Sequence, residues 1–328
     1  MAEHGMNGFV LGVDVGGTKV AAGLVDRQGK IHVQTRTPMA AVGDPAAGLR
    51  AVTSAIDLVS RRSPSEQPQG TIRAIGICCP GPLDPIAGRV INPPNLPCWR
   101  DYPLAAEVAD IYHLPVKLDN DANAAALAEA RWGAGRGSKN VFYATIGTGI
   151  GTGIVLEGKL YHGRTGAAGE GGHLSIDYRG PRCGCGKAGC IEAYASGPAL
   201  ARRTRERLAS GRASKLLPLA KWRIEAVTSE MLGEAYGAGD RLAAEILEET
   251  VELLCAWLGN LVDLLDPDVI IMGGGVAVML QPFLGKIRQQ LPQWAINSRS
   301  REIPLVMAHY GADAGIAGGA ALCSDVIE

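Results

Sequence analysis

Apolar and β-branched residues gather in short runs that alternate with segments of helical periodicity. The runs Phe9–Val15, Val20–Val25 and Ile31–Arg36 predict three strands of an antiparallel meander. In Pro45–Arg62, apolar residues recur every three or four positions, which predicts a helix with one buried face. Ile72–Cys78 then predicts another strand. The first quarter of the chain is therefore expected to form a sheet with a helix packed on it.

The same alternation continues through the middle of the chain. A helix at Leu104–Tyr112 and a strand at Val116–Leu118 complete an α/β unit, and a helix of small residues follows at Ala122–Trp132. After a glycine-rich turn come a strand at Val141–Ile146 and a hairpin strand at Gly153–Leu156. Helices that connect strands in this way predict parallel pairing and sheets covered on both faces.

The remaining segments repeat the α/β pattern with longer helices, and they predict two α/β domains that meet near residue 120. We assign residues 1–121 to a smaller domain and 122–312 to a larger one, and expect the C-terminal helix, 313–328, to rejoin the first. The expected elements are helices near Pro198–Ala209, Ser229–Tyr236, Asp240–Leu265 and Val276–Gln290, strands at Val269–Met272 and Leu305–Ala308, and a closing helix from Asp313.

Composition narrows the function classes. The chain has 328 residues, of which 47% are hydrophobic and 20% charged, as in ordinary globular proteins. Its net charge of -1 gives no global field for nucleic acid or an anionic membrane. The longest uncharged apolar stretch, Val269–Leu280, is too short for a membrane span of ~20 residues. We also find no signal peptide, and most cysteines are scattered in apolar segments, so we expect a cytoplasmic protein with reduced thiols.

Glycine is the residue in excess, with 44 copies that are clustered rather than periodic. The first cluster, LGVDVGGTK, ends a buried strand at Asp14 and continues with Gly16, Gly17, Thr18 and Lys19. Its amides, hydroxyl and ammonium are suited to an anion, and the carboxylate to hydrated Mg²⁺. A plain hairpin turn is the alternative interpretation of this segment.

Two further glycine loops follow predicted strands. Ala144–Val155 has the sequence ATIGTGIGTGIV, and Val269–Val276 has the sequence VIIMGGGV. Glycines repeated within a strand weaken it, so a closely bound ligand explains them better than packing does. There is no Walker A loop, and the single GxGxxG match follows no strand. Together the three loops predict a nucleotide site.

Four capping-type residues crowd one predicted helix start in LDNDANAAALAE. Asp119, Asn120, Asp121 and Asn123 surround the expected first helical residue, Ala122. One helix needs one cap, which Asp121 alone would supply. The surplus suggests that a carboxylate here accepts a proton from a bound hydroxyl while the neighbouring amide orients the substrate.

A zinc site is predicted by one histidine and three closely spaced cysteines. Glu170 and His173 lie in GAAGEGGHLSID, and Cys183, Cys185 and Cys190 follow. One imidazole and three thiolates form a closed tetrahedral site of the structural type. We expect loss of zinc to disorder residues 180–192 and to abolish activity while leaving the glycine loops competent.

These motifs, in this order, resemble the ROK family (repressors, open reading frames and sugar kinases) of the actin-like ATPase superfamily. The most specific elements are GEGGH and the following CGCGKAGCIEAYASG. The resemblance implies an α/β protein with two actin-like (ribonuclease H-like) domains around a central cleft and a zinc-stapled loop in the larger domain. ATP and Mg²⁺ would bind at the base of the cleft, and a sugar between the domains.

The resemblance also implies a role for individual residues, with Asp121 as the general base that activates the sugar hydroxyl. The residues implied in sugar binding are Gly81, Asn95, Asn120, Asp121, Glu170, His173 and Glu192. Zn²⁺ would be held by His173, Cys183, Cys185 and Cys190. The ATP and Mg²⁺ set comprises Asp14, Gly16, Gly17, Thr18, Lys19, Gly147, Thr148, Gly149, Gly273, Gly274 and Gly275.

The expected function is ATP-dependent transfer of the γ-phosphoryl group to the 6-hydroxyl of a hexose, with glucose favoured. N-acetylmannosamine, fructose, allose and N-acetylglucosamine remain open as substrates, because loop placement decides sugar stereochemistry. A sugar-responsive repressor of the same family is disfavoured, since about eight residues precede the first strand where a helix-turn-helix would be needed. The resemblance further implies a homo-oligomer, either a dimer or a tetramer.

Overall fold

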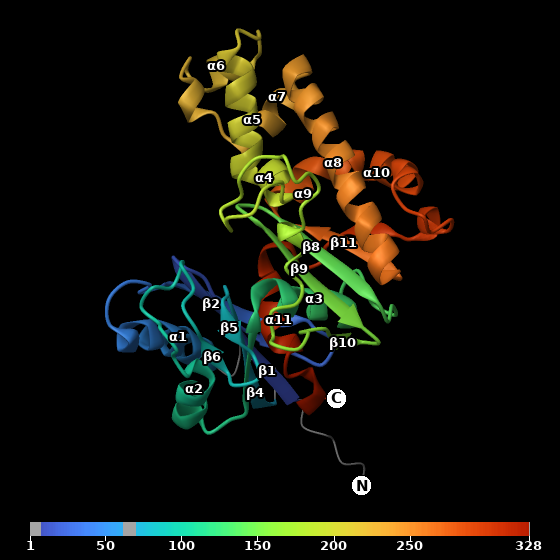
Figure 1. Ribbon diagram of the computed structural model, residues 1–328. Coiled ribbons are helices and arrows are strands. Elements are labelled where there is room, and N and C mark those ends of the chain that lie inside the picture. The colour runs from blue at the N-terminus through green and yellow to red at the C-terminus, as the bar shows by residue number, and fades with distance from the viewer. Residues whose placement is uncertain (1–7, 62–69, 328) are drawn as a thin grey trace. The chain divides into compact units, whose positions relative to one another are not determined.

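A computed structural model describes residues 8–61 and 70–327, and the chain divides into two compact units (Figure 1). Unit 1 comprises Met1–Lys139, Gly153–Gly169 and His309–Glu328, and unit 2 comprises Asn140–Thr152 and Glu170–Ala308. Residues 122–139, which the sequence analysis assigns to the second domain, thus group with unit 1 here, as does the C-terminal segment. Among the described helices, none combines the length and apolarity that a membrane crossing needs.

The sheet of unit 1 is mixed and has the strand order β3-β2-β1-β4-β7. Strands β1 (Gly8–Val15), β2 (Lys19–Val25) and β3 (Ile31–Pro38) pair antiparallel and confirm the predicted meander. Strands β4 (Thr71–Cys79) and β7 (Val116–Asn120) are parallel to β1. The carboxyl ends of β1, β4 and β7 therefore lie at the same edge, where Asp14 and Asn120 are found.

Helices cover the two faces of this sheet. On one face lie α1 (Pro45–Ser60) and α2 (Leu104–Tyr112), whose buried residues share a core with the sheet. The last residue of the first predicted helix, Arg62, lies outside the described residues. The other face packs against α3 (Asp121–Arg131) and α11 (Ala314–Ala321).

Glycines allow α11 to approach the sheet closely. A Cβ atom at Gly12 on β1 would overlap the carbonyl oxygen of Ile316, and one at Gly76 on β4 would overlap that of Gly319. Backbone therefore packs directly on backbone. This close approach brings the start of α11 next to the carboxyl end of β1.

The second sheet has the strand order β10-β9-β8-β11-β12. In unit 2, β8 (Val141–Ile146), β11 (Val269–Gly273) and β12 (Leu305–Met307) are parallel. Strand β9 (Ile150–Leu156) pairs antiparallel with β10 (Lys159–Leu160) around a turn at 157–158. A separate two-stranded ribbon, β5 (Leu83–Asp84) with β6 (Arg89–Val90), belongs to unit 1.

Unit 2 is mostly helical outside its sheet. Its helices are α4 (Glu192–Ala195), α5 (Gly197–Ala209), α6 (Leu216–Leu219), α7 (Ser229–Gly237), α8 (Arg241–Leu265), α9 (Gly275–Leu280) and α10 (Leu284–Gln290). The single helix predicted over Val276–Gln290 is wrong, because a 3₁₀ turn at Gln281–Phe283 separates α9 from α10. Pro282 lies in this turn, and proline lacks the N–H group that a continuous helix requires.

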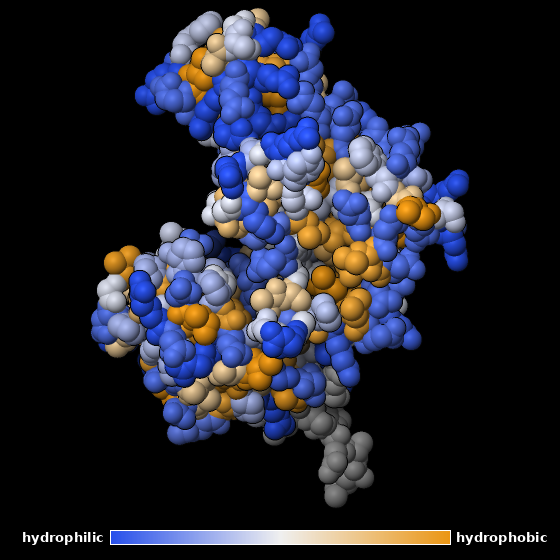
Figure 2. Space-filling model, viewed as in Figure 1, coloured by the Kyte–Doolittle hydropathy of each residue, from blue (hydrophilic) through white to orange (hydrophobic). Residues whose placement is uncertain are grey.

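The face shown in Figure 2 is hydrophilic over most of α5, α6 and α7, while apolar side chains gather near the C-terminal half of α8. Leu264 at the end of α8 is 74% exposed, and Ile296 in a following loop is 93% exposed.

Candidate functional site

The junction of β7 and α3 in unit 1 carries the predicted base. Asn120 caps α3, because its Oδ1 accepts the N–H groups of Ala122 at 2.9 Å and Asn123 at 3.4 Å. Asp121 is therefore the first helical residue and not the N-cap, although its Oδ1 also accepts the N–H of Ala122 at 2.8 Å. The side chain is accessible to solvent, but the surrounding protein partly desolvates it and raises its pKa.

Asp14 lies at the end of β1, near Asp121. Burial raises the pKa of Asp14 to about 6, and the negative charge of Asp121 acts in the same direction. A Cβ atom at Gly315, near the start of α11, would overlap the Asp14 carboxyl group, so only glycine fits there. A carboxylate held next to a second negative charge is a suitable ligand for Mg²⁺, which would offset that repulsion.

The predicted glycine turn follows Asp14. The N–H of Gly16 donates to the carbonyl oxygen of Lys19 at 2.9 Å, which closes a tight turn between β1 and β2. Thr18 and Lys19 are exposed. A Cβ atom at Gly17 would lie 2.7 Å from the backbone oxygen of Asn95, so this turn and Asn95 are neighbours.

Gly81 is close to the side-chain amide of Asn120. A Cβ atom at Gly81 would lie 3.7 Å from Asn120 Nδ2. Because Oδ1 of Asn120 caps the helix, the N–H donors of the same amide are the part available to a ligand. Unit 1 thus brings its predicted residues to one region of the sheet edge.

In unit 2, the GEGGH motif forms a 3₁₀ turn at Gly171–His173. The N–H of Gly171 donates to Thr152 Oγ1 at 2.7 Å, and the buried indole N–H of Trp257 donates to the Gly171 carbonyl at 3.0 Å. These contacts fix the backbone of the turn. Glu170, immediately before it, is exposed.

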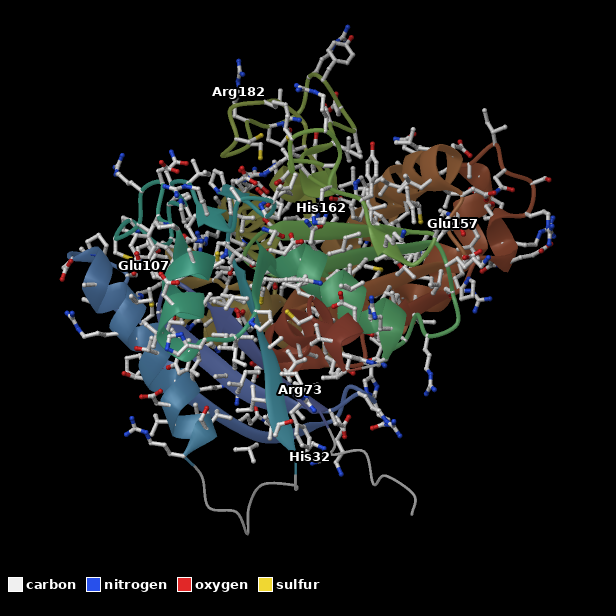
Figure 3. The ribbon with its side chains drawn as sticks, turned by 90° about the horizontal axis from the view of Figure 1, so that it is seen from below. His32, Arg73, Glu107, Glu157, His162 and Arg182 are labelled. Atoms are coloured by element: carbon white, nitrogen blue, oxygen red, sulfur yellow. The ribbon has the colours of Figure 1, made fainter. Side chains whose placement is uncertain are left out.

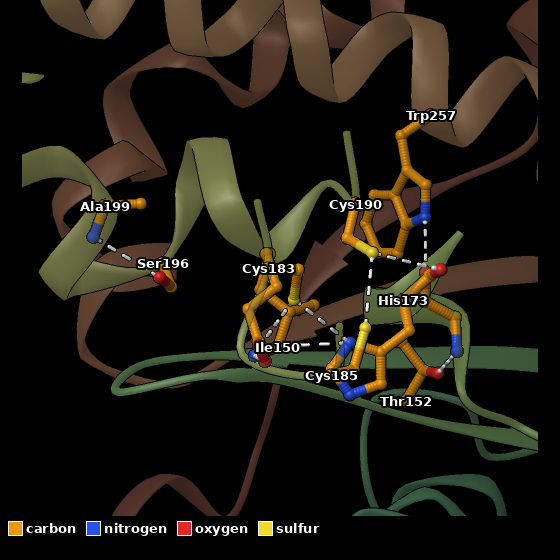
Figure 4. A network of polar contacts seen from close by, with 11 residues as sticks. Ile150, Thr152, His173, Cys183, Cys185, Cys190, Ser196, Ala199 and Trp257 are labelled. Atoms are coloured by element: carbon orange, nitrogen blue, oxygen red, sulfur yellow. Dashed lines mark hydrogen bonds and ion pairs between the residues drawn. The ribbon is translucent and has the colours of Figure 1, made fainter. Parts of the chain in front are cut away.

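The histidine and the three cysteines come together as predicted (Figure 4). Their ligand atoms all lie within 4.8 Å of one another. Cys183 Sγ is 3.6 Å from His173 Nδ1, and Cys185 Sγ is 3.6 Å from Cys190 Sγ. Zn²⁺ bonds of ~2.3 Å to sulfur and ~2.0 Å to nitrogen place tetrahedral ligands roughly 3.5–3.8 Å apart. The four residues therefore fit a closed zinc site that uses Nδ1 of His173.

Glu192 joins this cysteine cluster to a glycine loop. One carboxylate oxygen, Oε1, is 3.6 Å from Cys183 Sγ, and the other, Oε2, accepts the N–H of Ile150 at 2.8 Å. A Cβ atom at Gly149 would lie 2.7 Å from the same Oε2. A side chain at Gly149 would therefore displace the Glu192 carboxylate, and the cluster and the loop are directly connected.

A cavity of about 640 Å³ in unit 2 contains three of the predicted nucleotide residues, Gly147, Thr148 and Gly275. Gly273 and Gly274 do not line it. A Cβ atom at Gly274, whose φ is 86°, would overlap the backbone of Ile146, so this glycine allows β11 to turn into α9.

Most of the cavity wall was not predicted from the sequence. It comprises Gly197, Pro198, Ala201, Arg205, Thr228, Ser229, Glu230, Gly233, Val276 and Met279. Ser196 and Thr228 cap α5 and α7, so two helix N-termini, with their N–H groups, lie at the wall. These S-G-P and T-S-E starts were visible in the sequence, but nothing in it indicated that both helices face the same space.

Comparisons with known proteins identify the family and agree with the fold. The sequence model of the ROK family matches residues 10–326, and the chain belongs to the ROK family. It is 36% identical over 321 residues to the glucokinase of Streptomyces coelicolor, covering 97% of this chain and 98% of that protein. It is 34% identical over 318 residues to the glucokinase of Thermotoga maritima, covering 97% and 98%.

Solved structures give the same result. The ROK family glucokinase from Streptomyces griseus, crystallised with glucose and AMPPNP, superposes with a TM-score of 0.78 at 36% identity, covering 96% of this chain and 98% of that one.

The N-acetylmannosamine kinase of Escherichia coli O1:K1 is also similar in sequence, at 33% identity over 317 residues, covering 97% of this chain and 99% of that protein.

Proposed function

We propose that this protein is an ATP-dependent hexose kinase that transfers the γ-phosphoryl group to the 6-hydroxyl of glucose. The observation that carries the proposal is the Asp121 carboxylate, which is partly desolvated and close to Asp14, at the start of a helix whose N-cap is Asn120. The glucokinase relatives and the glucose and AMPPNP complex of the Streptomyces griseus enzyme support the same activity.

In unit 1, Asp121 would accept the proton of the sugar hydroxyl, and its raised pKa makes it a stronger base than an ordinary aspartate. The N–H donors of Asn120 would bind a neighbouring sugar oxygen, with Asn95 and Gly81 nearby. Asp14 would hold Mg²⁺, which would neutralise phosphate charge during transfer.

In unit 2, Glu170, Glu192 and Nε2 of His173 would bind sugar hydroxyls. The cavity lined by Gly147, Thr148 and Gly275 would take the nucleotide. Glycines let a phosphate or a flat ring approach the backbone, and the N-termini of α5 and α7 favour negative charge. The turn at Gly16, Gly17, Thr18 and Lys19 would contribute phosphate contacts from unit 1.

Zn²⁺ in this proposal is structural. Four protein ligands leave no position open for a water or a substrate. With Nδ1 of His173 facing Cys183, the other ring nitrogen has a fixed direction and tautomer, and it can bind a hydroxyl. The metal would therefore order His173 and Glu192 without taking part in the reaction.

N-acetylmannosamine is the second candidate substrate, favoured by the similarity to the Escherichia coli kinase. A spectrophotometric assay that couples ADP release to NADH oxidation decides between the two sugars. We expect kcat/KM for glucose to exceed that for N-acetylmannosamine, mannose, fructose, allose and N-acetylglucosamine by at least roughly tenfold, a difference of about 1.4 kcal/mol in transition-state binding. A higher value for N-acetylmannosamine would replace glucose as the substrate and leave the reaction type unchanged.

A further inference from the structure

Asp119, which precedes the Asn120–Asp121 pair, is a buried carboxylate with three hydrogen-bond partners. It is 3% exposed. Its Oδ1 accepts the backbone N–H of Asn120 at 2.7 Å and the side-chain amide of Asn123 at 3.1 Å, and its Oδ2 is 2.6 Å from His162 Nε2. Asp119 thus holds both the residue that caps α3 and a side chain in its first turn. Removing one hydrogen-bond partner leaves an oxygen of the buried carboxylate unsatisfied. The carboxylate is then held less firmly, and so are its remaining partners.

Of these three partners of Asp119, only His162 comes from a segment distant in the sequence. It follows β10, and its carbonyl oxygen accepts the N–H of Ala168 at 3.1 Å, closing the loop that leads to Glu170. The loop packs against the β5–β6 ribbon, since a Cβ atom at Gly166 would lie 2.9 Å from Pro85. One histidine therefore connects the loop before GEGGH with the residue before Asn120.

The surroundings of His162 favour a charged imidazole. The hydrogen bond to Asp119 raises the pKa of His162, and partial desolvation opposes the shift. The pair borders a cavity of about 310 Å³ in unit 1. The other charged side chains that line the cavity are Lys117, Arg131, Lys159 and Asp325. Lys117 is engaged by Asp325 at 3.0 Å, so Asp119 is the carboxylate that faces the imidazole.

We propose that His162 is a positioning residue for sugar phosphorylation, which acts through Asp119 to fix Asn120 and the start of α3. The inference rests on the proposed function, because Asn120 and Asp121 are assigned there to the sugar. His162 itself touches neither the sugar nor the nucleotide in this account. Its loss should therefore loosen sugar binding while ATP binding remains intact.

The test compares His162→Leu with His162→Gln and with a control pair of the same geometry. His32 Nε2 is 2.7 Å from Asp26 Oδ2 in another part of unit 1, and Figure 3 shows the two histidines well apart. We expect His162→Leu to raise KM for glucose roughly tenfold, with KM for ATP unchanged. His162→Gln keeps an N–H donor and should stay within roughly threefold of the wild type. His32→Leu should leave both constants unchanged.

The pH profile adds a readout that a merely structural role would not change. The ionic part of the His162–Asp119 pair is complete at low pH and is lost as pH rises through the raised pKa of His162. KM for glucose should therefore rise over that range in the wild type, and the step should be absent in His162→Gln. If KM for glucose depends on pH in His162→Gln as it does in the wild type, the proposal is wrong.

Amide hydrogen exchange separates this inference from the proposed function. The Asn120 N–H, which Asp119 accepts, should exchange faster in His162→Leu than in the wild type and should be unaffected in His32→Leu. If the Asn120 N–H exchanges faster in His162→Leu but the wild type phosphorylates no hexose, the contact is real and the proposed function fails. If the wild type is active but His162→Leu leaves KM for glucose and the Asn120 exchange rate unchanged, the inference is wrong.

Discussion

At the scale of single residues, the proposed reaction depends on Asn120 being the N-cap of α3 and Asp121 being the general base. The sequence alone allowed Asp121 to be a simple helix cap, because several capping-type residues stand together there. The structure places the cap on Asn120, with Oδ1 accepting two backbone N–H groups. Asp121 is not the N-cap, although its Oδ1 accepts the Ala122 N–H, and its partial desolvation makes it the candidate for a base.

Replacing Asp121 with asparagine tests this assignment. We expect Asp121→Asn to lower kcat by a factor of about 100 or more, since a lost general base usually costs 10²–10⁴ in rate. Glucose affinity in calorimetry and the melting temperature should remain close to the wild type. Asp110→Asn, on the exposed surface of α2, serves as the control. A fall in kcat of less than tenfold, with unchanged sugar affinity, would contradict the role of Asp121.

Individual residues also show what the sequence could not reveal. The zinc ligands could be predicted because their spacing and chemistry are specific. Gly315 could not, because its requirement arises only where α11 meets the Asp14 carboxyl group, some three hundred residues away in the chain. The same holds for Arg205, whose guanidinium donates to the Val227 carbonyl and reaches the cavity wall only in the folded unit.

At the scale of elements, periodicity predicted most helices and strands, and α2 and β8 match their predicted bounds. The prediction of one helix over Val276–Gln290 failed because of Pro282, which the regular apolar spacing gave no reason to treat as an interruption. The glycine loops were recognised as a group, but their members differ. Gly147 and Gly275 line the cavity, whereas Gly149 and Gly274 make room for Glu192 and for Ile146.

This difference determines which glycine is a clean probe of the nucleotide site. A side chain at Gly17 or Gly149 would meet Asn95 or Glu192 before any ligand, whereas a Cβ atom at Gly275 has no described heavy atom within 4 Å. We expect Gly275→Val to raise KM for ATP roughly tenfold by filling the cavity at the start of α9. Glucose binding and the melting temperature should not change.

Gly285→Val is the matched control for that experiment. Gly285 lies exposed on α10, away from the cavity, and a Cβ atom there also meets no described heavy atom within 4 Å. If Gly275→Val and Gly285→Val have the same KM for ATP as the wild type, the cavity does not hold the nucleotide.

The cysteine loop shows a dependence that the sequence did not suggest. From spacing alone, the glycine loops were expected to stay competent after zinc loss. Because Glu192 accepts the Ile150 N–H and lies beside Cys183, disorder in the cysteine loop should reach the loop at Gly147–Gly149. We therefore now expect Cys185→Ser to weaken AMPPNP binding as well as to abolish glucose phosphorylation.

Metal analysis and calorimetry check this prediction together. About one zinc per chain is expected in the wild type and in the control Cys255→Ser, which alters a buried thiol elsewhere in unit 2, and much less in Cys185→Ser. Wild-type protein that binds no zinc would contradict the metal assignment. A zinc-depleted Cys185→Ser variant with normal AMPPNP affinity would contradict the connection through Glu192.

At the scale of the whole molecule, two units of α/β architecture each carry part of the predicted machinery. Unit 1 holds the carboxylates Asp14 and Asp121, and unit 2 holds the zinc motif and the cavity. The identity of the sugar was the least predictable property, since it depends on small displacements of loops rather than on residue types.

The most direct test of the central claim is to follow the wild-type protein with glucose, ATP and Mg²⁺ by ³¹P NMR. The account predicts that the γ-phosphate signal of ATP disappears while glucose 6-phosphate and ADP appear in equal amounts, and that Asp121→Asn slows both together. Formation of ADP and inorganic phosphate with glucose unchanged, or of a sugar phosphorylated at another hydroxyl, would contradict it.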